Sequence, residues 1–188
     1  MDLLTWVRQE HDGLHTRLHD WFVADVPADL WMVRPGDLGC SFAWLILHTT
    51  MHQDVAIQVV VRGEEPLWAG WWHSLGLGAL PPAAALNEHD GLEPARPPDV
   101  TALVGYADAV ADATRRWLAG ATEADFDRVP PAAARLAEAG VTASDVAWVA
   151  ERWAAKPVSW FVQWEAIGHT LLHQGEMAAL RPRLGVRR

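Results

Sequence analysis

Two histidines near the C-terminal end of the chain have a spacing that suits metal chemistry. His169 and His173 lie in the segment Trp164–Glu176, and in a helix they would stand one turn apart on one face. His48 lies at the end of a second apolar segment, Ser41–His48. Neutral imidazole nitrogens are good ligands for zinc, nickel and similar ions. We therefore expect His48, His169 and His173 to meet inside the fold and hold one divalent transition metal ion.

Three protein ligands leave a position open for water or substrate, which is the pattern of a catalytic metal site. An ion held in this way lowers the pKa of a bound water or thiol and polarises a carbonyl group. The spacing alone leaves a second interpretation open. The chain contains 9 histidines, so pairs one turn apart also arise by chance, and such histidines can simply hydrogen-bond one another.

Three neighbouring residues are further candidates for the same site. His52, one turn beyond His48, is the first substitute if the ligand set is different. Glu165, one turn before His169, is the next substitute, and its alternative role is to accept a hydrogen bond that orients an imidazole. Glu176 has the same two interpretations, and we favour an orienting or surface position for it.

A separate histidine stripe, His11, His15 and His19, falls on one face of the first expected helix. Charged neighbours favour an exposed or partly exposed stripe. A second site, hydrogen bonds at the mouth of the bundle, or an acid or base that reaches the metal pocket remain alternatives. Cys40 has no sequence-adjacent base, so we interpret it as a small apolar residue.

Hydrophobic periodicity predicts four long helices, over residues 3–24, 41–61, 99–118 and 157–180, the last one stopping before Pro182. A turn capped by Thr122 is expected through Phe126, and short helices are expected over 132–138 and 146–155. Residues 142–145 resemble a capping box at the start of the latter helix. Pro35 and Gly36 predict a loop. Residues 63–98 contain no long periodic run, and a connection of this length lets the second and third long helices run parallel. Its tryptophans could line a pocket, form a dimer interface or pack in the core: Trp68, Trp71 and Trp72.

Length and composition predict a single domain over residues 1–188 with a sizeable core, because 51% of the 188 residues are hydrophobic. The net charge of −9 argues against a nucleic-acid partner. No apolar run reaches the roughly 18 residues of a membrane span. The single cysteine and the absence of a secretory signal pattern predict a cytoplasmic protein.

The second and last expected helices resemble those of the DinB superfamily, which includes mycothiol-dependent enzymes. The resemblance rests on a serine, a tryptophan and a histidine in the second helix, and on a His-x-x-x-His pattern with a Leu-Arg-x-x-Leu-Gly ending in the last. These are Ser41, Trp44, His48, His169, His173, Gly175, Leu180, Arg181, Leu184 and Gly185. Pro182 departs from the pattern. The resemblance implies an all-α four-helix bundle of the DinB type with long crossover connections, and a three-ligand metal site at His48, His169 and His173.

The resemblance also implies a function. Some members of the family use the metal to activate a low-molecular-weight thiol, mycothiol or bacillithiol, so we expect a thiol S-transferase or isomerase with zinc or nickel bound and a small-molecule substrate. The alternative is a metal-binding bundle without catalysis that acts as a sensor or dimeric interaction module. A homodimer is expected from the family habit of dimerising.

Overall fold

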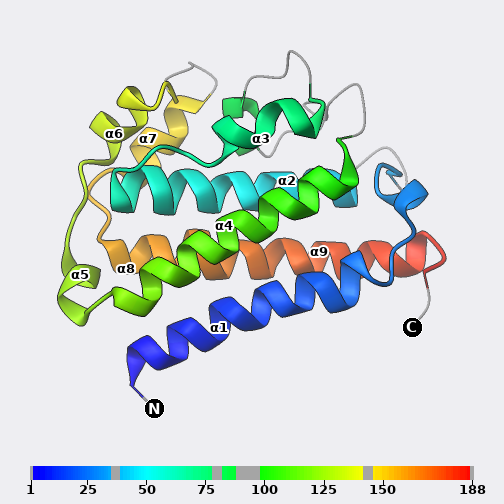
Figure 1. Cartoon of the computed structure of the whole chain (residues 1–188), viewed down its shortest axis with the longest axis horizontal. Helices are drawn as coiled ribbons and strands as arrows, with labels where there is room; N and C mark the ends of the chain where they lie inside the picture. The colour runs from blue at the N-terminus through cyan, green and yellow to red at the C-terminus, as the bar shows by residue number, and fades with distance from the viewer. Residues whose placement is uncertain (1, 35–38, 78–81, 88–97, 142–145, 187–188) are drawn as a thin grey trace.

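The computed structural model describes residues 2–34, 39–77, 82–87, 98–141 and 146–186, and within these ranges the regular elements are all helical. The expected all-α class is confirmed. Four long helices run through the molecule (Figure 1), with the bounds α1 (Leu3–Arg17), α2 (Phe42–Gln53), α4 (Val100–Gly120) and α9 (His169–Arg183). The expected loop at residues 35–36 and the expected capping box at 142–145 lie outside the described residues.

α1 begins at Asp2, whose carboxylate accepts a hydrogen bond from the backbone N–H of Thr5 at 2.8 Å. Such N-caps satisfy one of the donors that a helix start leaves unpaired. The helix continues as a π-helical turn, Leu18–Val23, which keeps Leu18 and Phe22 on the buried side. The expected first helix over 3–24 is thus one continuous helical segment with a local change of winding.

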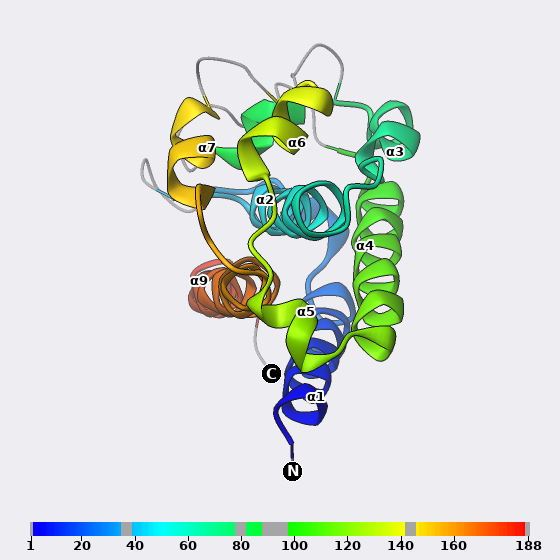
Figure 2. The same ribbon diagram turned by 90° about the vertical axis from the view of Figure 1, so that its left-hand side faces the viewer.

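α2 is the central helix of the molecule, and every one of its residues is buried. In the view along the bundle it lies between α4 and α9, with the shorter helices α3 (Trp68–Leu75), α6 (Ala132–Glu138) and α7 (Ala147–Trp153) above it (Figure 2). Ser41 caps it as expected, accepting from the N–H of Trp44 at 3.2 Å. A π-helical continuation, Asp54–Arg62, extends it to Gly63, whose φ of +72° suits a residue without a Cβ.

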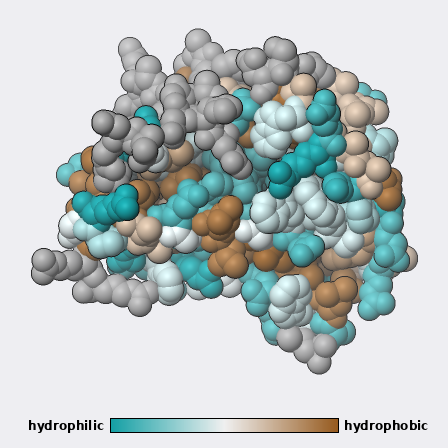
Figure 3. All heavy atoms as spheres, turned by 180° about the vertical axis from the view of Figure 1, so that it is seen from behind, coloured by the Kyte–Doolittle hydropathy of each residue, from teal (hydrophilic) through white to brown (hydrophobic). Residues whose placement is uncertain are grey.

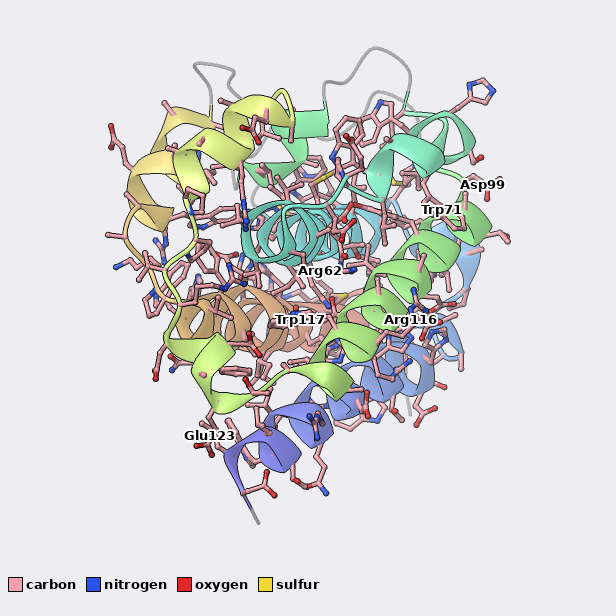
Figure 4. All side chains as sticks on the ribbon, turned by 60° about the vertical axis from the view of Figure 1, so that its left-hand side comes forward. Arg62, Trp71, Asp99, Arg116, Trp117 and Glu123 are labelled. Atoms are coloured by element: carbon pink, nitrogen blue, oxygen red, sulfur yellow. The ribbon has the colours of Figure 1, made fainter. Side chains whose placement is uncertain are left out.

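The crossover after Gly63 contains a helix that periodicity did not predict, α3 (Trp68–Leu75). Eight residues are too few to produce a clear helical period in a stretch rich in glycine and proline. The buried carboxylate of Asp54 fixes the start of α3 by accepting from the N–H groups of Leu67 at 3.1 Å and Trp68 at 2.8 Å. Trp71 packs on α4 (Figure 4), with its ring centroid 6.4 Å from that of Tyr106. A short 3-10 turn, Pro82–Leu86, follows α3.

The crossover lets α2 and α4 run in the same direction, as expected, while α1 and α9 run in the opposite direction (Figure 1). After α4 come α5 (Glu123–Asp127), α6 (Ala132–Glu138) and α7 (Ala147–Trp153), close to the expected positions. The last long segment consists of α8 (Val158–Phe161), a π-helical stretch (Val162–Gly168) and α9.

α9 does not stop before Pro182, as the sequence suggested, but includes it and ends at Arg183. A proline this close to the C-terminal end costs little beyond one backbone hydrogen bond. The helix then closes with paired bonds from Gly185 N–H to Pro182 C=O and from Val186 N–H to Arg181 C=O. Gly185 has a φ of +77°, so this is a Schellman ending.

The interior is filled by aliphatic side chains and by large aromatic rings, among them Trp31, Trp44 and Trp153. Hydrophobic side chains on the face seen in Figure 3 occur in small groups among hydrophilic ones. Among the described residues, no helix has both the length and the apolar character needed to cross a bilayer.

Candidate metal centre

Four buried histidines from two antiparallel helices gather in the middle of the bundle. His48 and His52 lie on α2, and His169 and His173 lie on α9. The ring centroid of His169 is 4.9 Å from that of His48, 4.4 Å from that of His52 and 4.5 Å from that of His173. The structure therefore brings together all three histidines that the sequence singled out, together with the first substitute.

The Nε2 atoms of three of these rings point at one another. His169 Nε2 lies 3.2 Å from His48 Nε2 and 2.9 Å from His173 Nε2. Two nitrogens that bind one tetrahedral zinc ion are about 3.3 Å apart, because each Zn–N distance is about 2.0–2.1 Å. The two observed separations are close to this value, so His169 and either neighbouring ring could bind one divalent ion after a small outward movement of the rings.

In His48 and His173 the second ring nitrogen, Nδ1, is hydrogen-bonded to an oxygen atom. His48 Nδ1 is 2.7 Å from the carbonyl oxygen of Ala85, which can only accept, so Nδ1–H donates there. His173 Nδ1 is 3.0 Å from Oε2 of Glu176. In a neutral imidazole one nitrogen donates and the other carries a lone pair. These contacts therefore leave the lone pairs of His48 and His173 on Nε2, facing His169.

His52 is held differently. Its Nε2 donates to the carbonyl oxygen of Leu86 at 3.0 Å, and its Nδ1 lies 2.9 Å from Oε2 of Glu165. The other oxygen of Glu165 accepts from the indole N–H of Trp153 at 2.7 Å. Glu165 Oε2 is also 3.9 Å from His169 Nδ1. Glu165 thus lies beside two of the four histidines as a buried carboxylate.

Two overlapping sets of histidines can therefore be considered as ligands. His48, His52 and His169 each offer a nitrogen within 4.8 Å of the other two, and these buried residues could hold a metal ion. The second set replaces His52 by His173 and uses the three Nε2 atoms described above. The two sets share His48 and His169.

Burial favours the neutral form of His48 and His169, the two histidines that both sets share. The pKa of His48 is well below its ordinary value of 6.5, chiefly because of burial and then because of the neighbouring His52. Burial also lowers the pKa of His169, and the surrounding histidines lower it further. Both imidazoles are therefore unprotonated at neutral pH, as a metal ligand must be.

A π-helical stretch directly precedes His169 and includes Glu165. Such wide turns are rare and are found frequently at functional sites, where they change which side chains share one face. Here Glu165 and His169 both point into the bundle, although the surrounding helix contains exposed residues such as Leu171 and Leu172. Glu165 and His169 are four residues apart, so the carboxylate shares the inward face of the helix with the ring.

An open cavity of about 300 Å³ lies against His48 and His173. Its other lining residues come from the start of α2 and from α9: Gly39, Cys40, Trp44, Leu45 and Glu176. A small molecule that enters this cavity therefore meets the edge of the histidine cluster. Trp68, Trp71 and Trp72, which the sequence suggested as a possible pocket wall, do not line it.

The prediction of an exposed histidine stripe on α1 is wrong for its first member. His11 is only 3% exposed, and its Nε2 lies 2.9 Å from Nε2 of Gln53 on α2. The charged neighbours that suggested exposure lie on the outer side of the same helix turn, whereas His11 shares the inward side with Val7 and Leu14. His15 and His19 are partly exposed, as expected.

Sequence analysis did not identify the acceptors that hold His48 and His52, nor the indole that binds Glu165. The carbonyl groups of Ala85 and Leu86 give no signal in a sequence, because every residue has one. Trp153 did offer a signal, since a buried indole N–H needs an acceptor. A search for buried acidic partners of the tryptophans would have connected Trp153 to Glu165.

Comparisons with known proteins agree with this fold. Residues 10–177 match the sequence profile of the DinB superfamily. A crystal structure described as that of a conserved protein from Enterococcus faecalis superimposes with a TM-score of 0.71 at 20% sequence identity, covering 97% of each chain. At this identity the likeness shows the fold alone. No curated protein sequence matches the chain significantly. Because the family profile covers most of its length, the chain belongs to the DinB superfamily.

Proposed function

We propose that His48, His169 and His173 hold one divalent transition metal ion, zinc or nickel, through their Nε2 atoms. The observation that carries this proposal is the position of His169 Nε2, which lies 3.2 Å from His48 Nε2 and 2.9 Å from His173 Nε2, with the ring centroids of His48 and His173 5.0 Å apart. His52 is the weaker third ligand, because both of its nitrogens already face oxygen atoms. We assign it a positioning role, in which it links Glu165 to the wall of the site.

The proposed metal site leaves one coordination position free, and an open cavity lies next to the ligands. Three protein ligands leave a coordination position free, and the cavity beside His48 and His173 supplies room for a second molecule. When bound there, a divalent ion lowers the pKa of a thiol or water and polarises a carbonyl group. Trp44 and Leu45 contribute the apolar part of the cavity lining, and His48, His173 and Glu176 contribute polar groups.

Glu176 is the proposed proton acceptor of this cavity. Its carboxylate lies among the lining residues, is 51% exposed, and already accepts from His173 Nδ1. A thiol that enters the cavity has to lose its proton before it can act as a nucleophile. We propose that a carboxylate oxygen of Glu176 receives this proton, while the same residue holds the ring of His173 in place.

We further propose that the protein is an enzyme of the thiol S-transferase or isomerase type, with mycothiol or bacillithiol as cosubstrate. This is supported by membership of the DinB superfamily, which the mycothiol-dependent enzymes share, and by the cavity beside the proposed metal. A metal-binding bundle without catalysis, acting as a sensor or interaction module, is the second candidate.

Metal binding is tested on protein that has been purified without a histidine tag and stripped with a chelator. We expect one tightly bound zinc per chain at the buried site, and a loss of at least about 100-fold in affinity in His173→Ala. His73→Ala is the matched control, since His73 lies on the exposed side of α3. Unchanged zinc affinity in His173→Ala, or a loss in His52→Ala alone, would favour the other ligand set.

Catalysis is tested on metal-loaded protein by following the consumption of mycothiol and of bacillithiol separately against a panel of electrophiles. We expect metal-dependent consumption of one thiol and a lower kcat in Glu176→Gln, whose amide can still accept from His173. If the loaded protein consumes neither thiol, the non-catalytic candidate replaces the enzyme.

A further inference from the structure

A second group of ligating side chains lies where α1 meets α4, apart from the buried histidines. His15 comes from the last turns of α1, His19 from the π-helical turn that follows it, and Asp108 from the middle of α4. One carboxylate oxygen, Asp108 Oδ1, lies 3.1 Å from His15 Nε2 and 2.7 Å from His19 Nε2. Two imidazoles and a carboxylate from two helices thus point at one place.

The cluster of His15, His19 and Asp108 is open to solvent on one side. The side chains of His15, His19 and Asp108 are 18%, 37% and 41% exposed. The two imidazole rings meet edge to face, with centroids 4.9 Å apart. A group of this kind differs from a buried hydrogen-bonding trio, because an ion can reach it and can complete its coordination with water.

The surrounding charges favour a cation. Arg115, the nearest basic residue on α4, pairs with both Asp12 at 2.8 Å and Asp112. One guanidinium is thus shared between two carboxylates, so the carboxylate of Asp108 adds to a local excess of negative charge. Burial lowers the pKa of His15, while Asp108 opposes this shift, so His15 is neutral at neutral pH.

We propose that His15, His19 and Asp108 form a second metal site that binds a zinc-class divalent cation and joins α1 to α4. Without the ion, His19 Nε2 is hydrogen-bonded to Asp108 Oδ1 at 2.7 Å and His15 Nε2 lies 3.1 Å from the same oxygen; on binding, a proton on either Nε2 moves to Nδ1 of the same ring, so that the Nε2 lone pair faces the ion. No proton has to be released by a neutral ring. Two imidazoles and one carboxylate form a known ligand set for zinc.

The site can be observed directly in the unaltered chain by NMR. Zinc is titrated into chelator-stripped protein, and the imidazole ¹H–¹⁵N signals of His15 and His19 are followed after assignment with the single alanine variants. We expect both sets of signals to move as a second equivalent of zinc binds, beyond the first equivalent at the buried cluster. If these signals stay unchanged up to millimolar zinc, the proposal is overturned.

The contribution of the carboxylate is tested with Asp108→Asn, which keeps size and shape. We expect at least about tenfold weaker zinc binding at this site, with the buried site unaffected. Asp20→Asn is the matched control, because it removes the same charge from an exposed position next to His19. Equal zinc affinity of this site in Asp108→Asn and the control overturns the three-ligand arrangement. Measuring the same pair in a His173→Ala background separates this result from any failure of the buried site.

Discussion

At the scale of single residues, the candidate metal centre depends on which nitrogen of each imidazole carries a proton. His48 donates to a main-chain carbonyl and His173 to a carboxylate, so both present Nε2 to the same place. Residue type and spacing made His48, His169 and His173 candidates, and the structure places their rings side by side. The choice between His52 and His173 as the third ligand depends on the groups that surround His52, which are the carbonyl of Leu86 and the side chain of Glu165. Both residues are far from His52 in the sequence, so the spacing of the histidines does not reveal these contacts.

Glu165 should influence metal binding without being a ligand. In Glu165→Gln the amide replaces a buried carboxyl group that lies 2.9 Å from His52 Nδ1 and accepts from the indole N–H of Trp153. Because residues that orient ligands contribute to affinity, we expect zinc binding to weaken by roughly 10- to 100-fold while its stoichiometry stays the same. Equilibrium competition with a zinc chelator measures this change. Glu151→Gln, at an exposed position on α7, should leave the affinity unchanged; a complete loss of the bound zinc in Glu165→Gln would instead make Glu165 a ligand.

The metal-free protein should lose stability as the pH falls below about 6.5. Burial lowers the pKa of His48 and His169 in the folded chain, so the unfolded chain takes up protons first. Their stabilising effect is complete above the unfolded pKa and is lost on acidification, by roughly 1 kcal/mol for each histidine between pH 7.5 and 5.5. Asp54 acts in the opposite direction, because burial raises its pKa to about 6.

Urea unfolding of the stripped protein at several pH values measures this dependence. His48→Gln should flatten the curve, since glutamine does not titrate, whereas Asp54→Asn should steepen it. A metal-free stability that is constant between pH 7.5 and 5.5 in the unaltered chain and in both variants would contradict the assignment of neutral, buried rings.

At the scale of elements, the long helices followed from the sequence because each has a clear cap or period. Ser41 and Asp2 cap α2 and α1 as single residues that can be recognised locally. α3 could not be recognised in this way. Its position depends on Asp54 and on a close approach to α4, which are contacts between segments far apart in the sequence. The π-helical stretches were also missed, since no local residue pattern specifies them.

The contact between α3 and α4 should be sensitive to a single methyl group. A Cβ at Gly105 on α4 would come within 2.8 Å of the ring of Trp71, so Gly105→Ala forces this ring to move. We expect a net loss of roughly 1–2 kcal/mol in the free energy of unfolding, even though alanine is the better helix former. Chemical denaturation measures this effect.

Gly13→Ala is the matched control for that substitution. Gly13 lies in α1, and a Cβ there would meet no atom within 4 Å. This variant should gain up to about 1 kcal/mol from helix propensity alone. The opposite order, with Gly105→Ala the more stable of the two, would show that Trp71 does not pack tightly on α4.

At the scale of the whole molecule, the proposed ion joins two helices that are separated by more than 100 residues. α2 and α9 pack side by side along the bundle, and the histidines are the polar part of their contact (Figure 2). A ligand that binds only the folded chain stabilises it by about 2.7 kcal/mol when its free concentration is 100 times its Kd. We therefore expect zinc to raise the melting temperature of the stripped protein by several degrees.

The part of this stabilisation that comes from the buried site should be absent in His48→Ala and His169→Ala, since each removes a shared member of both candidate ligand sets. His73→Ala should retain it in full. Differential scanning calorimetry at several zinc concentrations distinguishes specific binding, which saturates, from a general salt effect, which does not. A zinc-independent melting temperature in the unaltered chain would remove the basis for the metal centre and leave the helical architecture intact.

The short turn at Pro82–Leu86 supplies two consecutive main-chain carbonyls that hold neighbouring histidines of α2. Backbone groups are the same whatever side chain they carry, so the identity of Ala85 and Leu86 matters for core packing, where both are buried, and not for these hydrogen bonds. Insertions or deletions between α3 and α4 would move the carbonyls themselves and rotate both rings. Among related bundles, differences in the length of this connection would then change metal preference, even where every histidine is retained.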